Sequence, residues 1–329
     1  MGARVAGYAL PPPTTPSFFE RTRLAMHLAA NTIADIADAA ALARALRSFE
    51  PQVLFHLAAQ PIVRDAYREP VRTFATNVMG TVHALEAARA TPSLGQVVVY
   101  TTDKVYRNDQ SGRPFTEGDA LGGTEPYSAS KAGAEGVALA YAESYFRARG
   151  PALATVRAGN ILGGGDWAHD RLIPDAARAF AAGRPLVVRN PASTRPWQHV
   201  LDAVRGALLL AEHLDAAPAT TDGIAWNFGP APRDLRSVRD MADLAVRSWG
   251  AGALWRHEPD GSIPEATALV LSSERARAGL SWQCAWDAER SVAASIEWYR
   301  AALATTEDLW ELTRRQVDQH LADVARQAA

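Results

Sequence analysis

Two neighbouring stretches decide the fold: GQVVVYTTDKVYRND at residues 95–109 and, after a short loop, EPYSASKAGAE at residues 125–135. The first contains the apolar, β-branched run Val97–Val99, which is typical of a buried parallel strand. In parallel sheets, ligands bind at the carboxyl ends of the strands. The residues that follow this run, Thr102, Asp103 and Lys104, are therefore expected at the rim of a ligand crevice.

The second stretch places Tyr127 and Lys131 four residues apart at the start of a predicted helix, so both side chains share one face. An ammonium group beside a phenol stabilises the phenolate and lowers the pKa of the tyrosine. A tyrosine tuned in this way can remove a proton from a hydroxyl group while hydride leaves the same carbon. By itself the spacing also fits a surface tyrosine and a solvated lysine, and the preceding strand is what favours the catalytic interpretation.

The composition narrows the class of protein. The chain has 329 residues, of which 48% are hydrophobic, and a net charge of -2, which predicts a full core in two lobes and argues against a nucleic-acid partner. The single cysteine, Cys284, excludes a disulfide framework and a multi-cysteine metal site. No apolar stretch reaches the roughly 20 residues of a membrane span, and Pro11–Pro13 interrupts the apolar start of the chain. We expect a soluble cytoplasmic protein with no metal and no membrane partner.

Strand and helix patterns alternate along the chain, which predicts an α/β fold with a doubly wound parallel sheet. The predicted strands are residues 3–10, 52–57, 97–100, 152–157 and 224–228, and the predicted helices are residues 37–49, 71–90, 126–147, 201–214, 236–248, 286–303 and 305–327. A further helix over the string DRLIPDAARAFAAG is expected to begin at Asp170 as its cap. We expect residues 1–160 and about 190–225 to form a dinucleotide-binding domain, and about 161–189 and 226–329 to form an interleaved substrate lobe.

Several longer strings resemble one known family, the extended short-chain dehydrogenase/reductases. The wider family is marked by HLAAQ at 56–60, TNVMGT at 76–81, TTDKVY at 101–106 and YSASK at 127–131. Within it the chain is most similar to the CDP-glucose 4,6-dehydratases, through Lys104, VRAGNILGGGDWAHDRLIPD at 156–175, RNPASTRPWQHVLD at 189–202 and WNFGP at 226–230. The resemblance covers essentially the whole chain. It implies a Rossmann-like fold, NAD as cofactor and a hydro-lyase that converts CDP-glucose to CDP-4-keto-6-deoxyglucose.

One departure from the family concerns the glycine-rich turn. Relatives begin with a strand, a turn of the form GxxGxxG and a helix, whereas Met1 falls here where the second strand of the family would start. A βα unit of roughly 30 residues is therefore expected to be missing at the amino end. That turn normally cradles the dinucleotide pyrophosphate. We expect that the start lies at an internal methionine of a longer protein; the alternative is a truncated remnant that only binds nucleotide.

The resemblance also implies catalytic roles. Tyr127 would remove the proton of the C4 hydroxyl of the hexose, and Thr102 would hydrogen-bond the C4 oxygen. Asp103 would be the general acid for the departing C6 hydroxyl, and Lys104 would be the base at C5. Lys131 would bind the nicotinamide ribose and tune Tyr127. The alternative for Asp103 and Lys104 is a loop ion pair, and the alternative for Lys131 is a surface lysine.

For the cofactor, Asp35 and Ile36 resemble the adenine-edge contacts of the family, and Asp35 fits equally well as the N-cap of helix 37–49. Ala58 and Ala59 are small where the backbone would approach the cofactor, although plain packing also explains them. Asn77 is a poor helix former within helix 71–90, and in the family it holds a kink behind the active site.

For the substrate, Asn160, Arg171, Arg195 and Asn227 match positions that hold the diphosphate and sugar, while Arg189 is expected to be a surface charge. A homodimer through helices 71–90 and 126–147 is also implied. Two other functions stay open: another nucleotide-sugar dehydratase, or an epimerase. The acid at Asp103 followed by Lys104 argues against an epimerase, which has no need to protonate a C6 hydroxyl.

Overall fold

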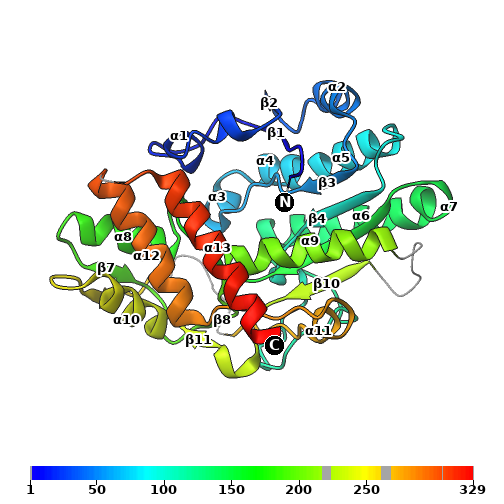
Figure 1. The fold of residues 1–329 in the computed structure, drawn as a ribbon. Helices are drawn as coiled ribbons and strands as arrows, with labels where there is room; N and C mark the ends of the chain where they lie inside the picture. The colour runs from blue at the N-terminus through cyan, green and yellow to red at the C-terminus, as the bar shows by residue number, and fades with distance from the viewer. Residues whose placement is uncertain (1, 217–223, 261–267, 306, 329) are drawn as a thin grey trace.

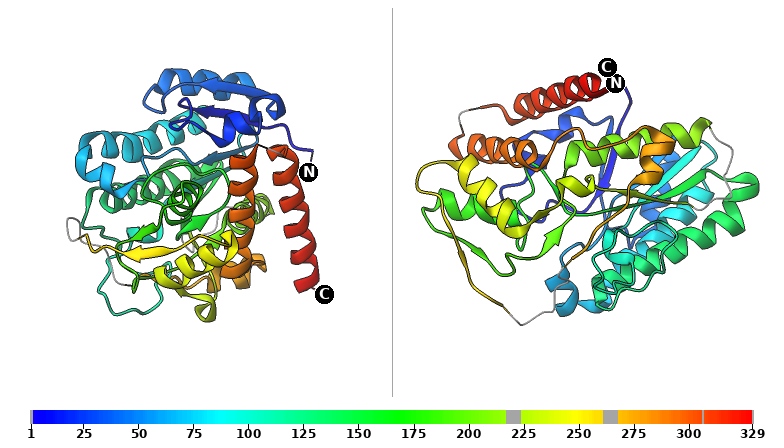
Figure 2. Two further views of the ribbon diagram at one scale, coloured as in Figure 1. Left: turned by 90° about the vertical axis from the view of Figure 1, so that its left-hand side faces the viewer. Right: turned by 90° about the horizontal axis from the view of Figure 1, so that it is seen from below.

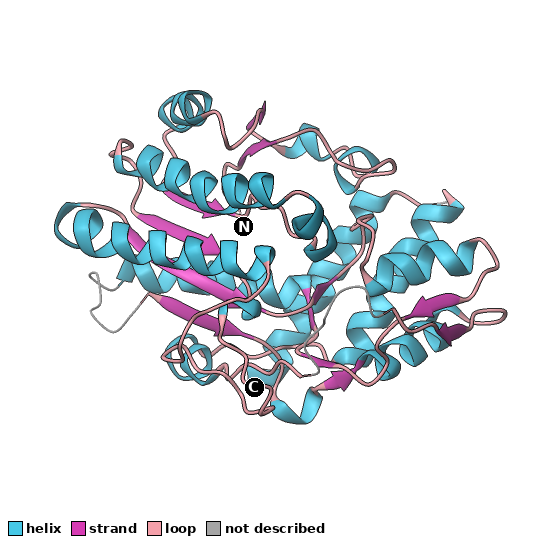
Figure 3. Cartoon of the chain, turned by 180° about the vertical axis from the view of Figure 1, so that it is seen from behind, coloured by secondary structure: helices cyan, strands magenta, loops and turns pink. Residues whose placement is uncertain are grey.

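The centre of the molecule is a four-stranded parallel sheet. A computed structural model describes residues 2–216, 224–260, 268–305 and 307–328. The sheet order is β10 (Ala225–Phe228), β5 (Ala152–Ala158), β4 (Gln96–Tyr100) and β3 (Val53–His56), and all neighbours are parallel (Figures 1 and 3). The expected strands at these places are confirmed, with small shifts of their ends.

The middle strand β4 separates two hydrophobic cores. Val97, Val98 and Val99 are at most 1% exposed. Val97 and Val99 belong to the core under α2 (Ala39–Phe49), α5 (Gly80–Arg89) and α6 (Pro126–Tyr141), and Val98 belongs to the core under α9 (Val200–Ala216). Successive strand residues face opposite sides, so one apolar run serves both layers. The expected doubly wound α/β fold is confirmed.

A second, smaller parallel sheet lies beside β3. It consists of β1 (Ala6–Ala9) and β2 (Ala30–Ile33), with Ala6 opposite Ala30. Within the described residues, β1 pairs only with β2 and β3 pairs only with β4. Figure 1 shows the two sheets one above the other with β1 and β3 as neighbours. Each of these two strands therefore presents an edge that is unpaired in the described part of the chain.

The two long helices of the first half are each interrupted by a π-turn. Helix α4 (Pro70–Phe74) passes through a π-turn at Ala75–Met79 into α5, and α6 passes through a π-turn at Ala142–Phe146 into α7 (Arg147–Arg149). The expected helices over 71–90 and 126–147 are present. The expected irregularity at Asn77 is one of these π-turns, and such turns occur frequently at functional sites.

The second lobe is built on helices. Helices α8 (Leu172–Ala181), α10 (Val238–Trp249) and α12 (Ala288–Ala304) surround a core that includes Met241 and Trp298, and α13 (Leu309–Ala328) packs outside α12 (Figure 2). Strands β7 (Leu186–Val188) and β12 (Trp255–His257) form a parallel pair at its edge. The shorter elements are α1 (Phe18–Arg21), η1 (Leu24–His27), α3 (Val63–Arg68), β6 (Ile161–Leu162), β8 (Thr194–Arg195), β9 (Gln198–His199), η5 (Pro232–Asp234), β11 (Arg236–Ser237) and α11 (Glu274–Leu280).

None of the described helices combines the length and the apolar character that crossing a membrane requires. No group of three or more metal-ligating side chains gathers in the parts of the chain that the structure covers.

Candidate active site

The carboxyl end of β4 carries the first half of the candidate site. After Tyr100 the chain enters a short turn, η3 (Asp103–Val105), capped by the Thr102 hydroxyl, which accepts from the Lys104 backbone N–H at 3.4 Å. The Asp103 side chain is 3% exposed. Its Oδ1 accepts a hydrogen bond from the Thr102 hydroxyl at 3.0 Å, and its Oδ2 has no partner among the described residues. Burial raises the pKa of Asp103 above its ordinary value.

The first turn of α6 carries the second half. The Glu125 carboxylate caps the helix by accepting from the backbone N–H groups of Tyr127 at 2.7 Å and Ser128 at 2.9 Å. This cap fixes Tyr127, which is 8% exposed, at the start of α6. Burial raises the pKa of Tyr127, and the nearby Thr102 side chain acts in the opposite direction. The Lys131 ammonium donates to the Tyr100 carbonyl at 2.9 Å. The structure thus brings Thr102, Asp103, Tyr127 and Lys131 together where β4 meets α6.

The expected effect of Lys131 on Tyr127 is wrong in this structure. Burial raises the pKa of Tyr127 to about 12 instead of lowering it, and the Thr102 hydrogen bond offsets only part of that rise. Burial also lowers the pKa of Lys131 to about 8. The physical reason is that neither group reaches bulk water, while the Lys131 ammonium binds the Tyr100 carbonyl.

Lys104 lies beside this group and is partly buried. The alternative of an Asp103–Lys104 ion pair is not what the structure contains, because the one hydrogen bond that Asp103 accepts from a side chain comes from Thr102. The Lys104 charge nevertheless lowers the pKa of Asp103, against the larger effect of burial.

Two arginines, Arg171 and Arg195, carry charges that act on this group of side chains. Arg195 on β8 is 8% exposed, and its charge lowers the pKa of Asp103. The charge of Arg171, at the start of α8, lowers the pKa of Tyr127. The Arg171 guanidinium lies 3.7 Å from the Asp166 carboxylate. The charges of both residues that the sequence assigned to the diphosphate and sugar therefore act on the Asp103–Tyr127 group.

The expected cap of α8 is wrong. The N-cap position belongs to Arg171, and Asp170 has a left-handed backbone with φ of 56°. The Asp170 carboxylate instead pairs with Arg189 at 2.7 Å and with Arg64 at 3.7 Å. Arg189, expected to be a surface charge, is consequently part of an ion-pair group one residue from Arg171.

The two asparagines expected to hold the substrate, Asn160 and Asn227, have different surroundings. Asn160 is partly buried after β5, and its carbonyl accepts from the Gln198 backbone N–H at 3.0 Å. Asn227 is fully buried, and its amide is occupied: it accepts from the Tyr106 hydroxyl at 2.6 Å and donates to the carbonyls of Phe115 and Ser272. This network holds Asn227 in place, and its expected contact with substrate stays a prediction.

The residues assigned to the cofactor follow β2 and β3, at the same edge of the sheets as Thr102. Asp35 is exposed, and its Oδ1 accepts from the Ala37 N–H at 2.9 Å, whereas Asp38 caps α2. The alternative of Asp35 as that N-cap is therefore wrong. Ile36 is 8% exposed, and its side chain lies against Gly80.

Ala58 and Ala59 lie directly after β3 and are partly buried. Asn77, in the π-turn, accepts from the Gln60 N–H at 2.8 Å and donates to the Ser130 hydroxyl at 2.9 Å. Asn77 is 1% exposed and links the loop after β3 to α6. Its position supports a role in holding the site together more than direct contact with a ligand.

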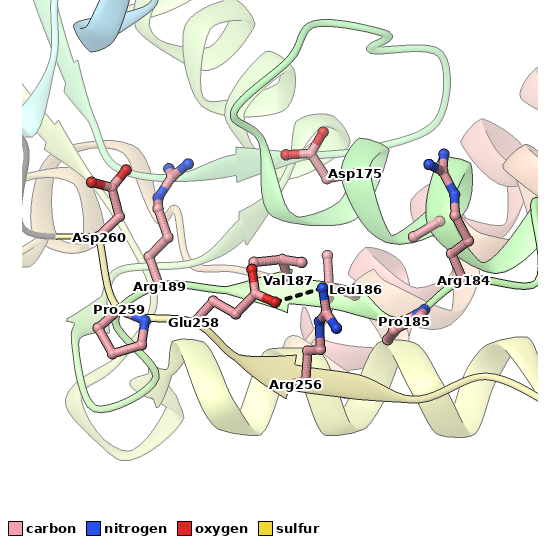
Figure 4. Close-up of a pocket in the computed structure, with 11 residues that line it drawn as sticks. Asp175, Arg184, Pro185, Leu186, Val187, Arg189, Arg256, Glu258, Pro259 and Asp260 are labelled. Atoms are coloured by element: carbon pink, nitrogen blue, oxygen red, sulfur yellow. Dashed lines mark ion pairs between the residues drawn. The ribbon is translucent and has the colours of Figure 1, made fainter.

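A pocket of about 580 Å³ opens in the second lobe between α8, β7 and the segment after β12 (Figure 4). Its wall combines the aliphatic side chains of Leu186 and Val187 with charged ones, among them Asp175 and Arg189. Arg189 connects the pocket to the active-site group through its ion pair with Asp170, the neighbour of Arg171.

Sequence reasoning missed the residues behind the site. Glu135 is 3% exposed on α6, one turn beyond Lys131, and pairs with Arg157 of β5 at 2.7 Å. The sequence could have pointed to Glu135, because Tyr127, Lys131 and Glu135 follow one another at intervals of four residues and so share one helix face.

The fold and this group of side chains define a class. A doubly wound parallel sheet, with a tyrosine and a lysine of the adjoining helix set against the end of the central strand, is the arrangement of a Rossmann-like dinucleotide-dependent enzyme. More specifically, the chain belongs to the NAD dependent epimerase/dehydratase family, whose family model matches residues 12–229.

Individual relatives are similar over most of the chain. The CDP-glucose 4,6-dehydratase of Salmonella typhimurium is 40% identical over 332 aligned residues, which cover 99% of this chain and 91% of the relative. The dTDP-glucose 4,6-dehydratase of the same organism is 30% identical, covering 82% of this chain and 78% of the relative.

Solved structures share the fold. A UDP-glucose-4-epimerase from Stenotrophomonas maltophila with bound NAD superposes with a TM-score of 0.80 at 21% identity, covering 93% of each chain. A dTDP-glucose 4,6-dehydratase from Bacillus anthracis in complex with NAD gives a TM-score of 0.74 at 18% identity, covering 94% of this chain and 99% of the other.

Proposed function

We propose that this protein is a nucleotide-sugar dehydratase, a hydro-lyase that converts CDP-glucose to CDP-4-keto-6-deoxyglucose and water. The observation that carries the proposal is the pairing of Tyr127 with a buried, partly unpartnered Asp103 at the end of β4. An epimerase needs only the tyrosine, whereas removal of water from C5 and C6 needs an acid for the leaving hydroxyl. The 40% identical CDP-glucose 4,6-dehydratase supports the choice of substrate.

The residues present fit NAD as cofactor. Lys131 projects from α6 to the end of β4, the small Ala58 and Ala59 follow β3, and the exposed Asp35 follows β2. Lys131 would bind the nicotinamide ribose, and Asp35 would accept from the adenine amino group. When bound, NAD supplies the hydride acceptor that makes the C4 carbonyl, and the same hydride is returned to C6, so the cycle is redox-neutral.

Tyr127 is the proposed base at the C4 hydroxyl, and Asp103 is the proposed acid at the C6 hydroxyl. Tyr127 removes the C4 hydroxyl proton while the Thr102 hydroxyl holds the C4 oxygen. The resulting carbonyl acidifies the C5 hydrogen. Asp103 then protonates the C6 hydroxyl as it leaves, which requires a neutral carboxyl group, and burial raises its pKa in that direction. The proton removed from C5 balances the one that Asp103 gives to the leaving hydroxyl, and a proton is added back at C5 when the hydride returns to C6. The net loss is therefore the C4 hydroxyl proton and the C6 hydroxide, which together make one water.

Lys104 is our assignment for the base at C5. Of the 34 basic residues in the chain, only Lys104 and Lys131 are lysines, and both lie in this site. An arginine stays protonated at any working pH, whereas an amine is a group that can serve as a base. The chain therefore keeps a titratable amine only at the two positions where the proposed chemistry uses one.

The substrate would lie across the two lobes. Arg171 and Arg195 would bind the diphosphate, because guanidinium groups bind phosphate oxygens in pairs, and Asn160 would contact the sugar. The pocket of about 580 Å³ beside Arg189 would receive the nucleoside, with its aliphatic wall against the base. Polar groups of the wall, such as Asp175, would fix the orientation of the base.

Apolar side chains on the α4–α7 surface support a homodimer as the working form. Val71 and Phe74 are 83% and 41% exposed, and Leu139 and Tyr145 are 50% and 53% exposed. Exposed apolar groups gathered on two neighbouring helices are typical of a protein–protein interface. We assign this surface to a second copy of the chain, in line with the sequence-based expectation for helices 71–90 and 126–147.

The proposal is tested by incubating the protein with CDP-glucose, with and without added NAD, and following the 4-keto sugar by its absorbance in base. Wild-type protein is expected to form the product, and Tyr127→Phe is expected to lose it. A matched control is Tyr67→Phe, which removes a hydroxyl from a 42% exposed tyrosine on α3. Product formed equally by both variants, or by neither variant nor wild type, would contradict the proposed function.

A further inference from the structure

Helix α6 carries a third buried titratable side chain that the proposed mechanism does not use. Tyr127, Lys131 and Glu135 follow one another at intervals of four, and their exposures are 8%, 6% and 3%. A fully buried carboxylate is costly unless it is paired and hydrogen-bonded. The position of Glu135, one turn beyond the lysine of the site, therefore calls for a specific partner.

The Glu135 carboxylate uses both oxygens. Its Oε1 accepts from the Thr101 hydroxyl at 2.5 Å. Its Oε2 accepts from the Thr155 hydroxyl at 3.0 Å and from the Arg157 guanidinium at 2.7 Å. Arg157 in turn donates to the Tyr106 hydroxyl at 3.0 Å. One carboxylate thus joins α6 to the ends of both β4 and β5.

The end of β4 is consequently held to α6 at two consecutive residues. Lys131 donates to the Tyr100 carbonyl, and Glu135 accepts from the Thr101 side chain. The next two residues are Thr102 and Asp103, the groups that face Tyr127. A change in this attachment would move the acid and the hydroxyl relative to the tyrosine, and misplacement by about 1 Å is enough to slow a reaction strongly.

The charges around Lys131 come from four elements. Burial lowers the pKa of Lys131, and the negative charge of Glu135 on the same helix raises it, for a result of about 8. From β3, His56 contributes no positive charge near neutral pH, because burial lowers its pKa to about 3. From β5, Arg157 is the cation that pairs with Glu135, and from η3, Asp103 is held toward its neutral form by burial. Among these groups Glu135 supplies the charge that raises the pKa of Lys131.

We propose that Glu135 is a positioning residue of this site: its buried carboxylate fixes the end of β4 against α6 and places a negative charge one helical turn from Lys131. Its importance for catalysis rests on the proposed function, whereas its effect on Lys131 does not. Loss of this charge is expected to lower the pKa of Lys131 further and so to weaken its ammonium as the partner of the Tyr100 carbonyl and of a ribose hydroxyl.

The test uses the fact that the chain has only two lysines, Lys104 and Lys131. Protein labelled with 13C-lysine gives two side-chain signals by NMR, and Lys104→Arg assigns them. In Glu135→Gln, the pH at which the Lys131 signal titrates is expected to fall by at least about 1 unit. In Glu135→Asp, which keeps the charge, it is expected to stay close to the wild-type value.

Two further variants keep the test decisive if Glu135→Gln folds poorly. Glu135→Gln combined with Arg157→Gln leaves no uncompensated buried charge, and its Lys131 signal is still expected to titrate below the wild-type pH. Asp202→Asn breaks the other buried pair, in which Asp202 of α9 lies 2.9 Å from His320 of α13, and serves as the matched control. It is expected to lower stability and to leave the Lys131 titration unchanged.

The outcomes separate the two proposals. A folded Glu135→Gln or double variant in which Lys131 titrates at the wild-type pH would overturn the role of Glu135. If the protein makes a keto sugar, the alkaline limb of its kcat/KM profile is expected to move with the NMR titration in each variant. If it makes none, the dehydratase proposal fails, and the NMR measurement still decides the role of Glu135.

Discussion

Burial and nearby positive charges shift the pKa of the Asp103 carboxyl group in opposite directions, and burial has the larger effect. Asp103 is 3% exposed, and one of its oxygens has no partner among the described residues. Because its folded-state pKa is raised, the folded protein holds this proton more tightly than the unfolded chain does. Stability from this group is full below the unfolded pKa of about 3.8 and is lost as the pH rises through the raised folded value.

The variant Asp103→Asn is expected to keep its stability as the pH rises, because an amide of the same shape stays neutral at every pH. We expect its Tm to exceed that of wild type by a few degrees at pH 8, with little difference at pH 4. Formation of the 4-keto sugar is expected to fall by about 10²–10⁴-fold, since the acid is gone. Thermal unfolding at the two pH values and the product assay check both parts, and a lower Tm at pH 8 would contradict the explanation.

The spacing of residues in the sequence predicted the positions of individual side chains only within one helix or one strand. The face shared by Tyr127 and Lys131 follows from helix geometry, and the place of Thr102 and Asp103 follows from the strand before them. The raised pKa of Tyr127 was not predictable in this way, because burial is decided by the second lobe as well as the first. The hydrogen bonds of Asn227 were not predictable for the same reason, because its partners lie in segments distant in sequence.

At the level of elements, the pair β1–β2 differs from the main sheet. Two-stranded sheets are only marginally stable alone, and Val5, Leu10 and Ile33 around this pair are 52%, 50% and 50% exposed. Strands β4 and β5 are buried between two helical layers. The backbone hydrogen bonds of β1–β2 are therefore expected to open far more readily than those of β4–β5.

Hydrogen exchange measures this difference directly. Amides of β1 and β2 are expected to exchange at least about 100-fold faster than those of β4 and β5 in the same sample. The comparison is internal, so it needs no second variant. Equal protection of the two sheets would mean that the edges of β1 and β3 are stabilised by contacts that this account lacks.

Helical periodicity predicted α5 and α6 well and gave no sign of their π-turns. The turn at Ala75–Met79 depends on Asn77, whose amide binds Gln60 and Ser130 from two other elements. A pattern of apolar residues carries no information about such contacts. The cap of α8 was missed similarly, because ion pairs with Arg64 and Arg189 hold the Asp170 side chain elsewhere.

For the molecule as a whole, two buried histidines set the response to acid. Burial lowers the pKa of both His56 and His199 from 6.5 to about 3. Groups with a lowered folded-state pKa contribute stability above the unfolded value, and that stability is lost as the pH falls through 6.5 toward 3. For each unit by which the pH falls in that range, each histidine is expected to lower the unfolding free energy by up to about 1.4 kcal/mol.

Urea unfolding between pH 7 and pH 4.5 checks this expectation. His56→Gln retains a polar partner for the Thr81 hydroxyl, which lies 3.1 Å from the imidazole, and does not titrate. Its unfolding free energy is expected to fall less steeply with acid than that of wild type. The exposed His27 offers a matched control for the substitution itself, His27→Gln. Parallel slopes for all three proteins would rule out the role of His56.

The proposed dimer is also a property of the whole molecule. Leu139→Glu and Val71→Glu place charges on the α4–α7 surface and are expected to yield monomers by light scattering after size exclusion. Leu254→Glu, at a residue that is 53% exposed in the second lobe, is the control and is expected to leave the dimer intact. Wild-type protein that elutes as a monomer would contradict the proposed interface.

The most direct measurement of the central claim follows one hydrogen. CDP-glucose carrying deuterium at C4 is incubated with the protein and NAD, and the sugar product is analysed by NMR and mass spectrometry. The account predicts a product that has lost water and carries the deuterium on C6, because the hydride taken from C4 is returned there. A product that has kept its water, with the deuterium still on C4 and the C4 configuration inverted, would show an epimerase and contradict the account.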